Sequence, residues 1–348
     1  MTAPRQIRVL VVDDSATSRQ LLCAILRGDP GIAVIGEASN GAEAVEKALK
    51  LGPDLITMDV QMPVMNGIEA TKEIMIVAPT PIIIVSAAGN QAGLDHSFDA
   101  MQAGALMVLA KPAAPQAPQF AEQSVQLIDM VKAMAHLKVV RRWGPRGVSP
   151  SGAVRASTAR PGVGPLVAIG TSTGGPAALR RILIALPSEF PAPVAIVQHI
   201  ANGFVGGLAS WLSGSCSLHV KVAEEGERVT PHNVYIGPDD RHFGFTPDGR
   251  VSLSDGPPIG GFRPSVSHLF DSAAQVYGGN LTAVVLTGMG SDGVSGLGAA
   301  RRAGARVLAQ DAATSVVFGM ANEAVNAGVV HEVLPVDLIA PRLIELHS

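Results

Sequence analysis

The stretch that decides the fold of this chain is Ala168-Ile169-Gly170-Thr171-Ser172-Thr173-Gly174-Gly175-Pro176. It follows the apolar run 165–169, which predicts a buried strand, and it precedes residues 177–186, whose apolar spacing predicts a helix. Residues 170–174 fit the pattern G-x-S-x-G, in which a tight turn exposes a nucleophilic serine. The same turn could instead bind a phosphate or be purely structural, although no lysine follows its glycines. On this stretch alone, all three interpretations stay open.

Composition limits the class of protein. The chain has 348 residues, 47% hydrophobic residues and 38 glycines, which suits two aliphatic α/β domains with many tight turns. A net charge of −3 favours neither nucleic acid nor an anionic membrane as a partner. No apolar run is long enough to span a bilayer, and residues 1–6 have no signal-peptide core, so we expect a cytoplasmic protein without direct membrane insertion. Cys23 and Cys216 lack metal-ligand spacing and are expected to be plain thiols.

The first part of the chain alternates short apolar runs with helical patterns. Strands are expected at 7–12, 33–38, 55–58, 81–85 and 105–109, and the first two helices at 16–27 and 41–51. Five β/α repeats of this kind predict a doubly wound parallel sheet.

Polar side chains follow the ends of these strands. They are Asp13 and Asp14, Asp59, Ser86, and Lys111. Ligands of open α/β sheets bind at the carboxyl ends of the strands, so we expect these groups to meet there. Carboxylates suit Mg²⁺, while the lysine and the serine suit the oxygens of a phosphoryl group. Each residue alone could be a solvated loop residue, but the set together argues against that interpretation.

These residues resemble the response-regulator receiver family over residues 5–138. The match depends on Asp13-Asp14, on Asp59 followed by Met62-Pro63 and Gly67, on Ser86, and on Lys111-Pro112. The resemblance implies a flavodoxin-like fold in which a histidine kinase phosphorylates Asp59. It implies that Asp13, Asp14 and Asp59 bind Mg²⁺ with help from the Gln61 carbonyl, and that Ser86 and Lys111 act as switch residues. Val108 departs from the family, since many receivers have an aromatic residue there.

The junction between the two halves has a different composition. Apolar residues at near-helical spacing between about 118 and 143 predict the last receiver helix. Residues 139–161 are rich in glycine, proline, serine and arginine and predict a flexible linker. The second domain is expected to cover residues 162–348.

Two further strands of the second half deliver polar residues. The strand expected at 193–197 leads to His199, and the strand at 281–286 leads to the turn that contains Asp292. Ser172, His199 and Asp292 could therefore share one crevice, although a single histidine at a strand end is more often structural. The order Ser, His, Asp excludes the α/β-hydrolase, chymotrypsin and subtilisin folds, but it does not exclude triad chemistry.

The residues within the motifs are stronger evidence for a particular family than the order of the motifs along the chain. The stretches that carry a resemblance are 169–176, Gln198-His199, Arg263-Pro264-Ser265-Val266, 286–293 and Phe318-Gly319-Met320. They resemble the chemotaxis protein-glutamate methylesterase domain, so the whole chain is similar to the CheB family of response regulators, whose catalytic domain is Rossmann-like. The resemblance implies a cofactor-free esterase that hydrolyses glutamyl methyl esters on methyl-accepting chemoreceptors and deamidates receptor glutamines.

The resemblance also implies the roles of single residues. Ser172 is the nucleophile, His199 the general base and acid, and Asp292 the group that orients the histidine. The backbone N–H groups of Thr173 and Met289 are the oxyanion donors.

One departure from the family and two alternative functions remain. His199 is followed by Ile200-Ala201-Asn202 where the family usually has Met-Pro, which predicts a looser loop and an altered receptor-docking surface. The chain could be a receiver-controlled binding module without turnover, or an esterase that serves a receptor array unrelated to motility. A DNA-binding regulator is disfavoured, because the second half has neither a basic stripe nor a compact helix-turn-helix.

Overall fold

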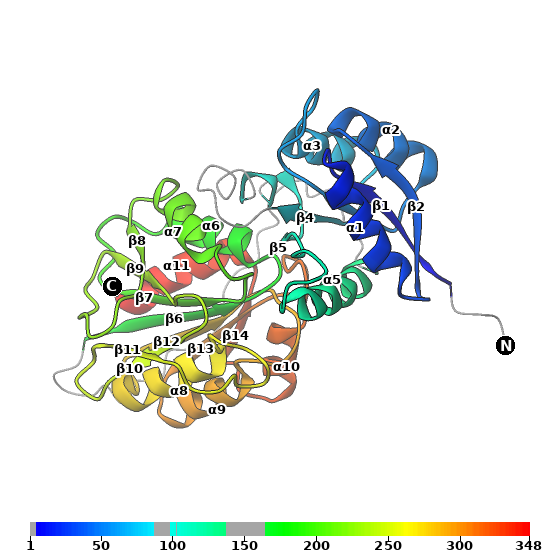
Figure 1. Cartoon of the computed structure of the whole chain (residues 1–348). Coiled ribbons are helices and arrows are strands. Elements are labelled where there is room, and N and C mark those ends of the chain that lie inside the picture. Colours follow the sequence, from blue (N-terminus) through cyan, green and yellow to red (C-terminus); the bar gives the residue numbers. More distant parts are fainter. Residues whose placement is uncertain (1–4, 87–97, 102, 137–163) are drawn as a thin grey trace. The chain divides into compact units, whose positions relative to one another are not determined.

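A computed structural model describes residues 5–86, 98–101, 103–136 and 164–348. The chain divides into two compact units, Met1–Val148 and Ser149–Ser348 (Figure 1). The linker expected at 139–161 lies outside the described residues. Among the described residues, no helix is both long and apolar enough to cross a bilayer.

The N-terminal unit is a five-stranded parallel sheet with the strand order β2-β1-β3-β4-β5. Its strands are β1 (Ile7–Val12), β2 (Ile32–Ala38), β3 (Leu55–Met58), β4 (Ile82–Ser86) and β5 (Met107–Ala110), and its helices are α1 (Ala16–Arg27), α2 (Gly41–Leu51), α3 (Gly67–Val77) and α5 (Phe120–Met134). The central strands β1, β3 and β4 are almost completely buried, as expected for strands covered on both faces.

Polar caps define where the helices of this unit begin. The Ser15 side chain accepts a hydrogen bond at the start of α1, and the Asn66 side chain forms a capping box with Glu69 at the start of α3. Both caps follow the carboxyl end of a strand, where the polar residues expected from the sequence also lie.

The C-terminal unit contains a seven-stranded parallel sheet with the order β14-β13-β12-β6-β7-β9-β8. Its strands are β6 (Leu166–Thr171), β7 (Val194–Gln198), β8 (His219–Val222), β9 (Asn233–Ile236), β12 (Leu281–Val285), β13 (Arg306–Gln310) and β14 (Glu332–Leu334). The strands β10 (His242–Phe245) and β11 (Val251–Ser254) form a separate antiparallel pair. The two sheets confirm the expected architecture of two doubly wound α/β domains.

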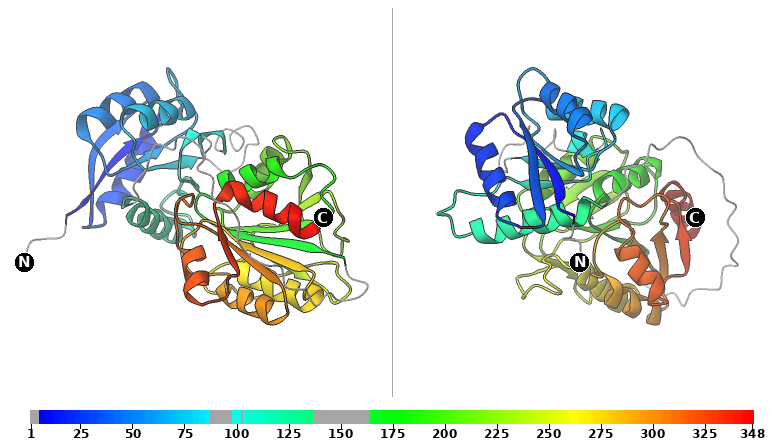
Figure 2. Two further views of the ribbon diagram at one scale, coloured as in Figure 1. Left: turned by 180° about the vertical axis from the view of Figure 1, so that it is seen from behind. Right: turned by 90° about the vertical axis from the view of Figure 1, so that its right-hand side faces the viewer.

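Helices cover both faces of the larger sheet (Figure 2). They are α6 (Gly175–Ala185), α7 (Val205–Ser213), α8 (Val266–Tyr277), α9 (Val294–Arg302), α10 (Met320–Asn326) and α11 (Val336–His347). Helices α6 and α11 lie on one face, and α8 and α9 lie on the other.

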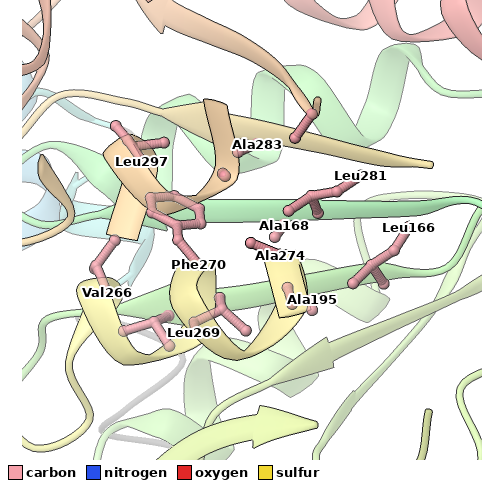
Figure 3. Packing of buried hydrophobic residues seen from close by; sticks show 14 of the residues in the cluster. Leu166, Ala168, Ala195, Val266, Leu269, Phe270, Ala274, Leu281, Ala283 and Leu297 are labelled. Atoms are coloured by element: carbon pink, nitrogen blue, oxygen red, sulfur yellow. The ribbon is translucent and has the colours of Figure 1, made fainter. Parts of the chain in front are cut away.

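The core under α8 holds that helix close to the central strand. Phe270 and Leu269 of α8 belong to one buried cluster with Ala168 of β6 and Ala283 of β12 (Figure 3). A Cβ atom at Gly170 would lie 2.0 Å from the Val266 side chain, so only glycine permits this approach. The close packing brings the N-terminus of α8 to the carboxyl edge of the sheet.

Several boundaries differ from the expected ones. Strand β6 continues to Thr171, two residues beyond the expected end, and α6 begins two residues before its expected start. Helix α5 ends at Met134 in a region where the sequence pattern predicted a helix to about residue 143, and the residues from 137 onward lie outside the described ranges. His242 lies buried in β10, a strand that the sequence pattern did not predict.

Candidate active site

The carboxyl ends of three adjacent strands bring Ser172, His199 and Asp292 to one edge of the larger sheet. Strand β6 pairs with β12 on one side and with β7 on the other. The Ser172 N–H donates to the Thr287 carbonyl at 3.1 Å, and the His199 N–H donates to the Thr171 carbonyl at 2.9 Å. The strand order reverses direction at β6, which is where ligands of open α/β sheets bind.

The serine sits in a closed turn between β6 and α6. Its carbonyl accepts the N–H of Gly175 at 2.9 Å, and Gly174 has a φ of 79°, a backbone conformation that favours glycine. Gly288 passes so close that a Cβ atom there would lie 2.7 Å from the Ser172 Cβ. The turn is therefore held from both sides and presents the serine at the sheet edge.

The buried Gln198 side chain connects the nucleophile's turn with the histidine. Its Nε2 donates to the Ser172 carbonyl at 2.8 Å and to the His199 carbonyl at 2.7 Å. One amide thus limits how far the two backbones can separate. The sequence singled out Gln198 only as the neighbour of the histidine.

Asp292 is held by the N-terminus of α8. Its Oδ1 accepts from the Ser265 hydroxyl at 2.9 Å and from the Ser267 N–H at 3.0 Å, and its Oδ2 accepts from the Val266 N–H at 2.7 Å. The same Oδ2 lies 3.0 Å from His199 Nε2. Burial alone would raise the pKa of Asp292, but the hydrogen bond and charge of His199 and the donors of Ser267 outweigh it and hold the pKa well below its usual range.

One nitrogen of the His199 ring contacts Asp292, and the other has no hydrogen-bond partner among the described residues. Because Nε2 faces the Asp292 carboxylate, Nε2 carries the proton in the neutral ring and donates it to this acceptor. Nδ1 is buried and has no hydrogen-bond partner within the described part of the chain. The ring is therefore reversed relative to the serine-protease arrangement, in which the aspartate binds Nδ1.

Two backbone N–H groups beside the serine are available to a ligand. Neither Thr173 N–H nor Met289 N–H is hydrogen-bonded to another described residue. Thr173 is fixed through its carbonyl, which accepts the Thr287 hydroxyl at 2.9 Å. Gly288, next to Met289, donates to the Val317 carbonyl at 3.0 Å and accepts from Met320 N–H at 2.9 Å. The segment around Phe318-Gly319-Met320 therefore supports the Met289 turn.

The loop after His199 is anchored despite the absence of proline. The Phe204 N–H donates to the Ala201 carbonyl at 3.2 Å, and Gly203 in this turn has a φ of 89°. The Gly203 N–H also donates to the Asp239 carboxylate at 3.0 Å. The looser loop expected from Ile200-Ala201-Asn202 remains a prediction, but these contacts act against it.

The acidic cluster of the N-terminal unit forms a separate site. Ligand oxygens of Asp13, Asp14 and Asp59 lie within 4.8 Å of one another, and Asp13 and Asp59 are buried. The Lys111 ammonium lies 2.8 Å from Asp13 and 2.7 Å from Asp59. Ser86, at the end of β4, accepts the Lys111 N–H through its backbone carbonyl at 2.8 Å.

The charges of this cluster do not balance. The Lys111 ammonium contacts two of the three carboxylates, and burial raises the pKa of Asp13 while Lys111 offsets only part of this effect. Burial alone would lower the pKa of Lys111, but its contacts with Asp13 and Asp59 raise it. The unbalanced carboxylate oxygens fit a hard divalent cation such as Mg²⁺.

Comparison with known proteins agrees with both halves. The response regulator receiver domain family matches residues 9–118, and the CheB methylesterase family matches residues 167–343. The chain is 49% identical to protein-glutamate methylesterase/protein-glutamine glutaminase 4 of Myxococcus xanthus (strain DK1622), over 97% of this chain and 96% of that one. It is 48% identical to protein-glutamate methylesterase/protein-glutamine glutaminase 3 of Anaeromyxobacter dehalogenans (strain 2CP-C), over 97% and 98% of the two chains.

A solved structure matches the C-terminal unit. The Thermotoga maritima CheB methylesterase catalytic domain is 43% identical, with a TM-score of 0.52, and the match covers 53% of this chain and 99% of that one. Fold and comparisons together define a response regulator with an enzymatic output domain. The chain belongs to the CheB family of methylesterases.

Proposed function

We propose that this chain hydrolyses glutamyl methyl esters on methyl-accepting chemoreceptors, with Ser172, His199 and Asp292 as the catalytic triad. The observation that carries the assignment is the His199 ring, whose Nε2 binds a fixed carboxylate at 3.0 Å while its buried Nδ1 has no partner among the described residues. In such a ring Nδ1 can accept a proton, and the Ser172 hydroxyl at the same edge of the sheet can supply it.

The reaction follows from these roles. Ser172 Oγ attacks the ester carbonyl while His199 Nδ1 takes its proton, and Asp292 stabilises the imidazolium. Thr173 N–H and Met289 N–H donate to the oxyanion, where one such donor can contribute about 10²–10³ in rate. Methanol leaves with the proton from His199. Water then attacks the acyl-enzyme with the histidine as base, which releases glutamate and the free serine.

The same residues support deamidation of receptor glutamines. A glutamine amide places its carbonyl where the ester carbonyl would lie, and ammonia leaves in place of methanol. The Myxococcus xanthus relative is named for both activities, and we propose both for this chain. We also propose that the chain acts in the cytoplasm. The chemistry needs no cofactor in the C-terminal unit.

The N-terminal unit is proposed as the regulatory switch. A histidine kinase of the chemotaxis type would phosphorylate Asp59, and Asp13, Asp14 and Asp59 would hold Mg²⁺, which compensates phosphate charge when bound. Ser86 and Lys111 would contact the new phosphoryl group, whose charge of about −1.5 to −2 biases the nearby loops. The proposed boundaries are 5–138 for the receiver, 139–161 for the linker and 162–348 for the esterase.

Mass spectrometry of methylated receptor peptides tests this function. Incubation with the wild-type chain should convert glutamyl methyl esters to glutamate and certain glutamines to glutamate. Ser172→Ala should abolish both conversions. Equal conversion by wild type and Ser172→Ala, or no conversion by either, would support a binding module without turnover.

A further inference from the structure

A short hairpin places an aromatic ring against the proposed catalytic histidine. The Ile259 N–H donates to the Phe262 carbonyl at 3.0 Å, and the Phe262 N–H donates back to the Ile259 carbonyl at 3.1 Å. The two residues between them are Gly260 and Gly261, with φ of 59° and 88°, the left-handed values that a tight hairpin turn requires. The backbone of this turn therefore determines where Phe262 points.

Arg263 anchors the hairpin to the body of the domain. Its Nε donates to Asp240 at 2.8 Å, and its Nη1 donates to the carbonyl of Gly256 at 3.1 Å and to that of Asp255 at 3.2 Å. The anchor directly follows Phe262 in the chain. The aromatic side chain is thus attached to a fixed support.

The Phe262 ring lies flat on the His199 ring. The ring centroids are 4.0 Å apart and the planes differ by only 3°. Parallel contact of this kind restricts rotation of the imidazole about its bond to Cβ, and it adds to the restraint from the contact of Nε2 with Asp292. It also covers one face of the ring, leaving 9% of the His199 side chain exposed.

We propose that Phe262 is a positioning residue that holds the plane of the His199 ring, so that Nδ1, which has no hydrogen-bond partner among the described residues, can take the Ser172 proton during the reaction. The face of an aromatic ring attracts a cation, so the stack also stabilises the imidazolium that forms when the serine loses its proton. This inference rests on the proposed role of His199. Phe262 has no role in the reaction scheme above.

The test compares three variants of the full chain. Phe262→Leu removes the flat ring and keeps an apolar side chain, Phe262→Tyr keeps the ring, and Ile259→Ala changes the exposed position on the opposite arm of the hairpin. Two rates are measured: methanol release from methylated receptor, and covalent labelling of Ser172 by a fluorophosphonate, which needs the serine and its base but no receptor.

Phe262→Leu should lower kcat and the labelling rate by about tenfold to a hundredfold, because small displacements of a catalytic group are this costly. KM should stay within about twofold of wild type, while Phe262→Tyr and Ile259→Ala should match wild type in both rates. The NMR signals of the His199 ring protons should lie upfield in wild type and in Phe262→Tyr, as a stacked ring requires, and move downfield in Phe262→Leu.

Unchanged labelling in a folded Phe262→Leu variant would overturn the positioning role, and so would ring-proton signals that do not move. Labelling that is equal in wild type and Ser172→Ala would instead refute the proposed function itself. The two failures are therefore distinguishable.

Discussion

At the residue scale, Asp292 is the most constrained group of the site. Its carboxylate accepts two backbone N–H groups at the start of α8 and the Ser265 hydroxyl, in addition to His199 Nε2. Helix N-termini stabilise negative charge, and these donors also determine which carboxylate oxygen faces the histidine. The arrangement assigns a role to Arg263-Pro264-Ser265-Val266, a stretch whose function the sequence did not explain.

Asp292→Asn should lower kcat by about 10³–10⁴-fold. The asparagine amide would face His199 Nε2 as a donor, so the ring would carry its proton on Nδ1 and could not accept one from Ser172. Methanol release measures the effect. Asp271→Asn, at an exposed position of α8, is the control and should keep full activity. A comparable loss in both variants would point to damage to the helix.

His347 is the second informative residue, because burial lowers its pKa to about 4. Its ring packs edge-on against Phe190, and its Nε2 lies 3.2 Å from the Thr282 hydroxyl. An unfolded histidine takes up a proton below about pH 6.5, whereas the folded one resists it until the pH nears 4. The contribution of neutral His347 to the free energy of unfolding is therefore fully present above pH 6.5, and it decreases as the pH falls toward 4.

His347→Gln should reduce this loss. Its melting temperature should fall less between pH 7 and pH 4.5 than that of the wild type, as followed by circular dichroism. His219→Gln, in which an exposed histidine is replaced, should leave the acid dependence unchanged. If His347→Gln and wild type have parallel pH profiles, the half-buried His347 ring does not control acid stability.

At the element scale, the turn around Gly288 combines two functions. It packs against the nucleophile and leads into the Met289 N–H proposed for the oxyanion. A Cβ atom at Gly288 would lie 2.7 Å from Ser172 Cβ and in even closer contact with the Met320 side chain. There is no space for a methyl group without moving the serine turn or α10.

Gly288→Ala should therefore lower kcat by about 10²-fold, since the serine and the oxyanion donor are displaced together. Gly206→Ala in α7 is the matched control, because a Cβ atom there meets nothing within 4 Å. This control should keep wild-type activity and gain a little stability, as alanine favours helix. Methanol release and thermal unfolding of both variants provide the comparison. Full activity of Gly288→Ala would show that the turn tolerates displacement.

At the scale of the whole molecule, a response regulator receiver domain and a methylesterase domain are joined in one chain. We propose that the unphosphorylated receiver restrains the esterase and that phosphorylation of Asp59 releases it. Coupling of this kind typically changes activity about 5–150-fold. Acetyl phosphate with Mg²⁺ should therefore accelerate methanol release by the full chain, and Asp59→Asn should abolish the acceleration without changing the basal rate.

A shortened chain beginning at Gly162 tests the direction of this control. Removal of the receiver should give a rate at least as high as that of the phosphorylated full chain, and the rate should not respond to acetyl phosphate. A shortened chain no faster than the unphosphorylated full chain would contradict restraint. A shortened chain slower than the unphosphorylated full chain would indicate that the receiver activates the esterase instead.

The sequence by itself determined the two parallel sheets and the residues at their carboxyl ends. This was possible because buried parallel strands appear as short apolar runs, and the polar residues that follow them must share one edge of the sheet. Ser172, His199, Asp292 and Asp59 were therefore located without coordinates. The short strands β8 to β11, β13 and β14 were not, since strands of three to five residues carry little periodic signal.

Only the tertiary structure decided how the site is held. The stack of Phe262 on His199, the amide of Gln198 between two carbonyls and the α8 donors to Asp292 depend on distances between segments far apart in the chain. Which imidazole nitrogen faces the carboxylate depends on a ring orientation, and no local pattern encodes that orientation. Spacing along the chain predicts where a strand ends, whereas contacts between side chains form only when the elements pack.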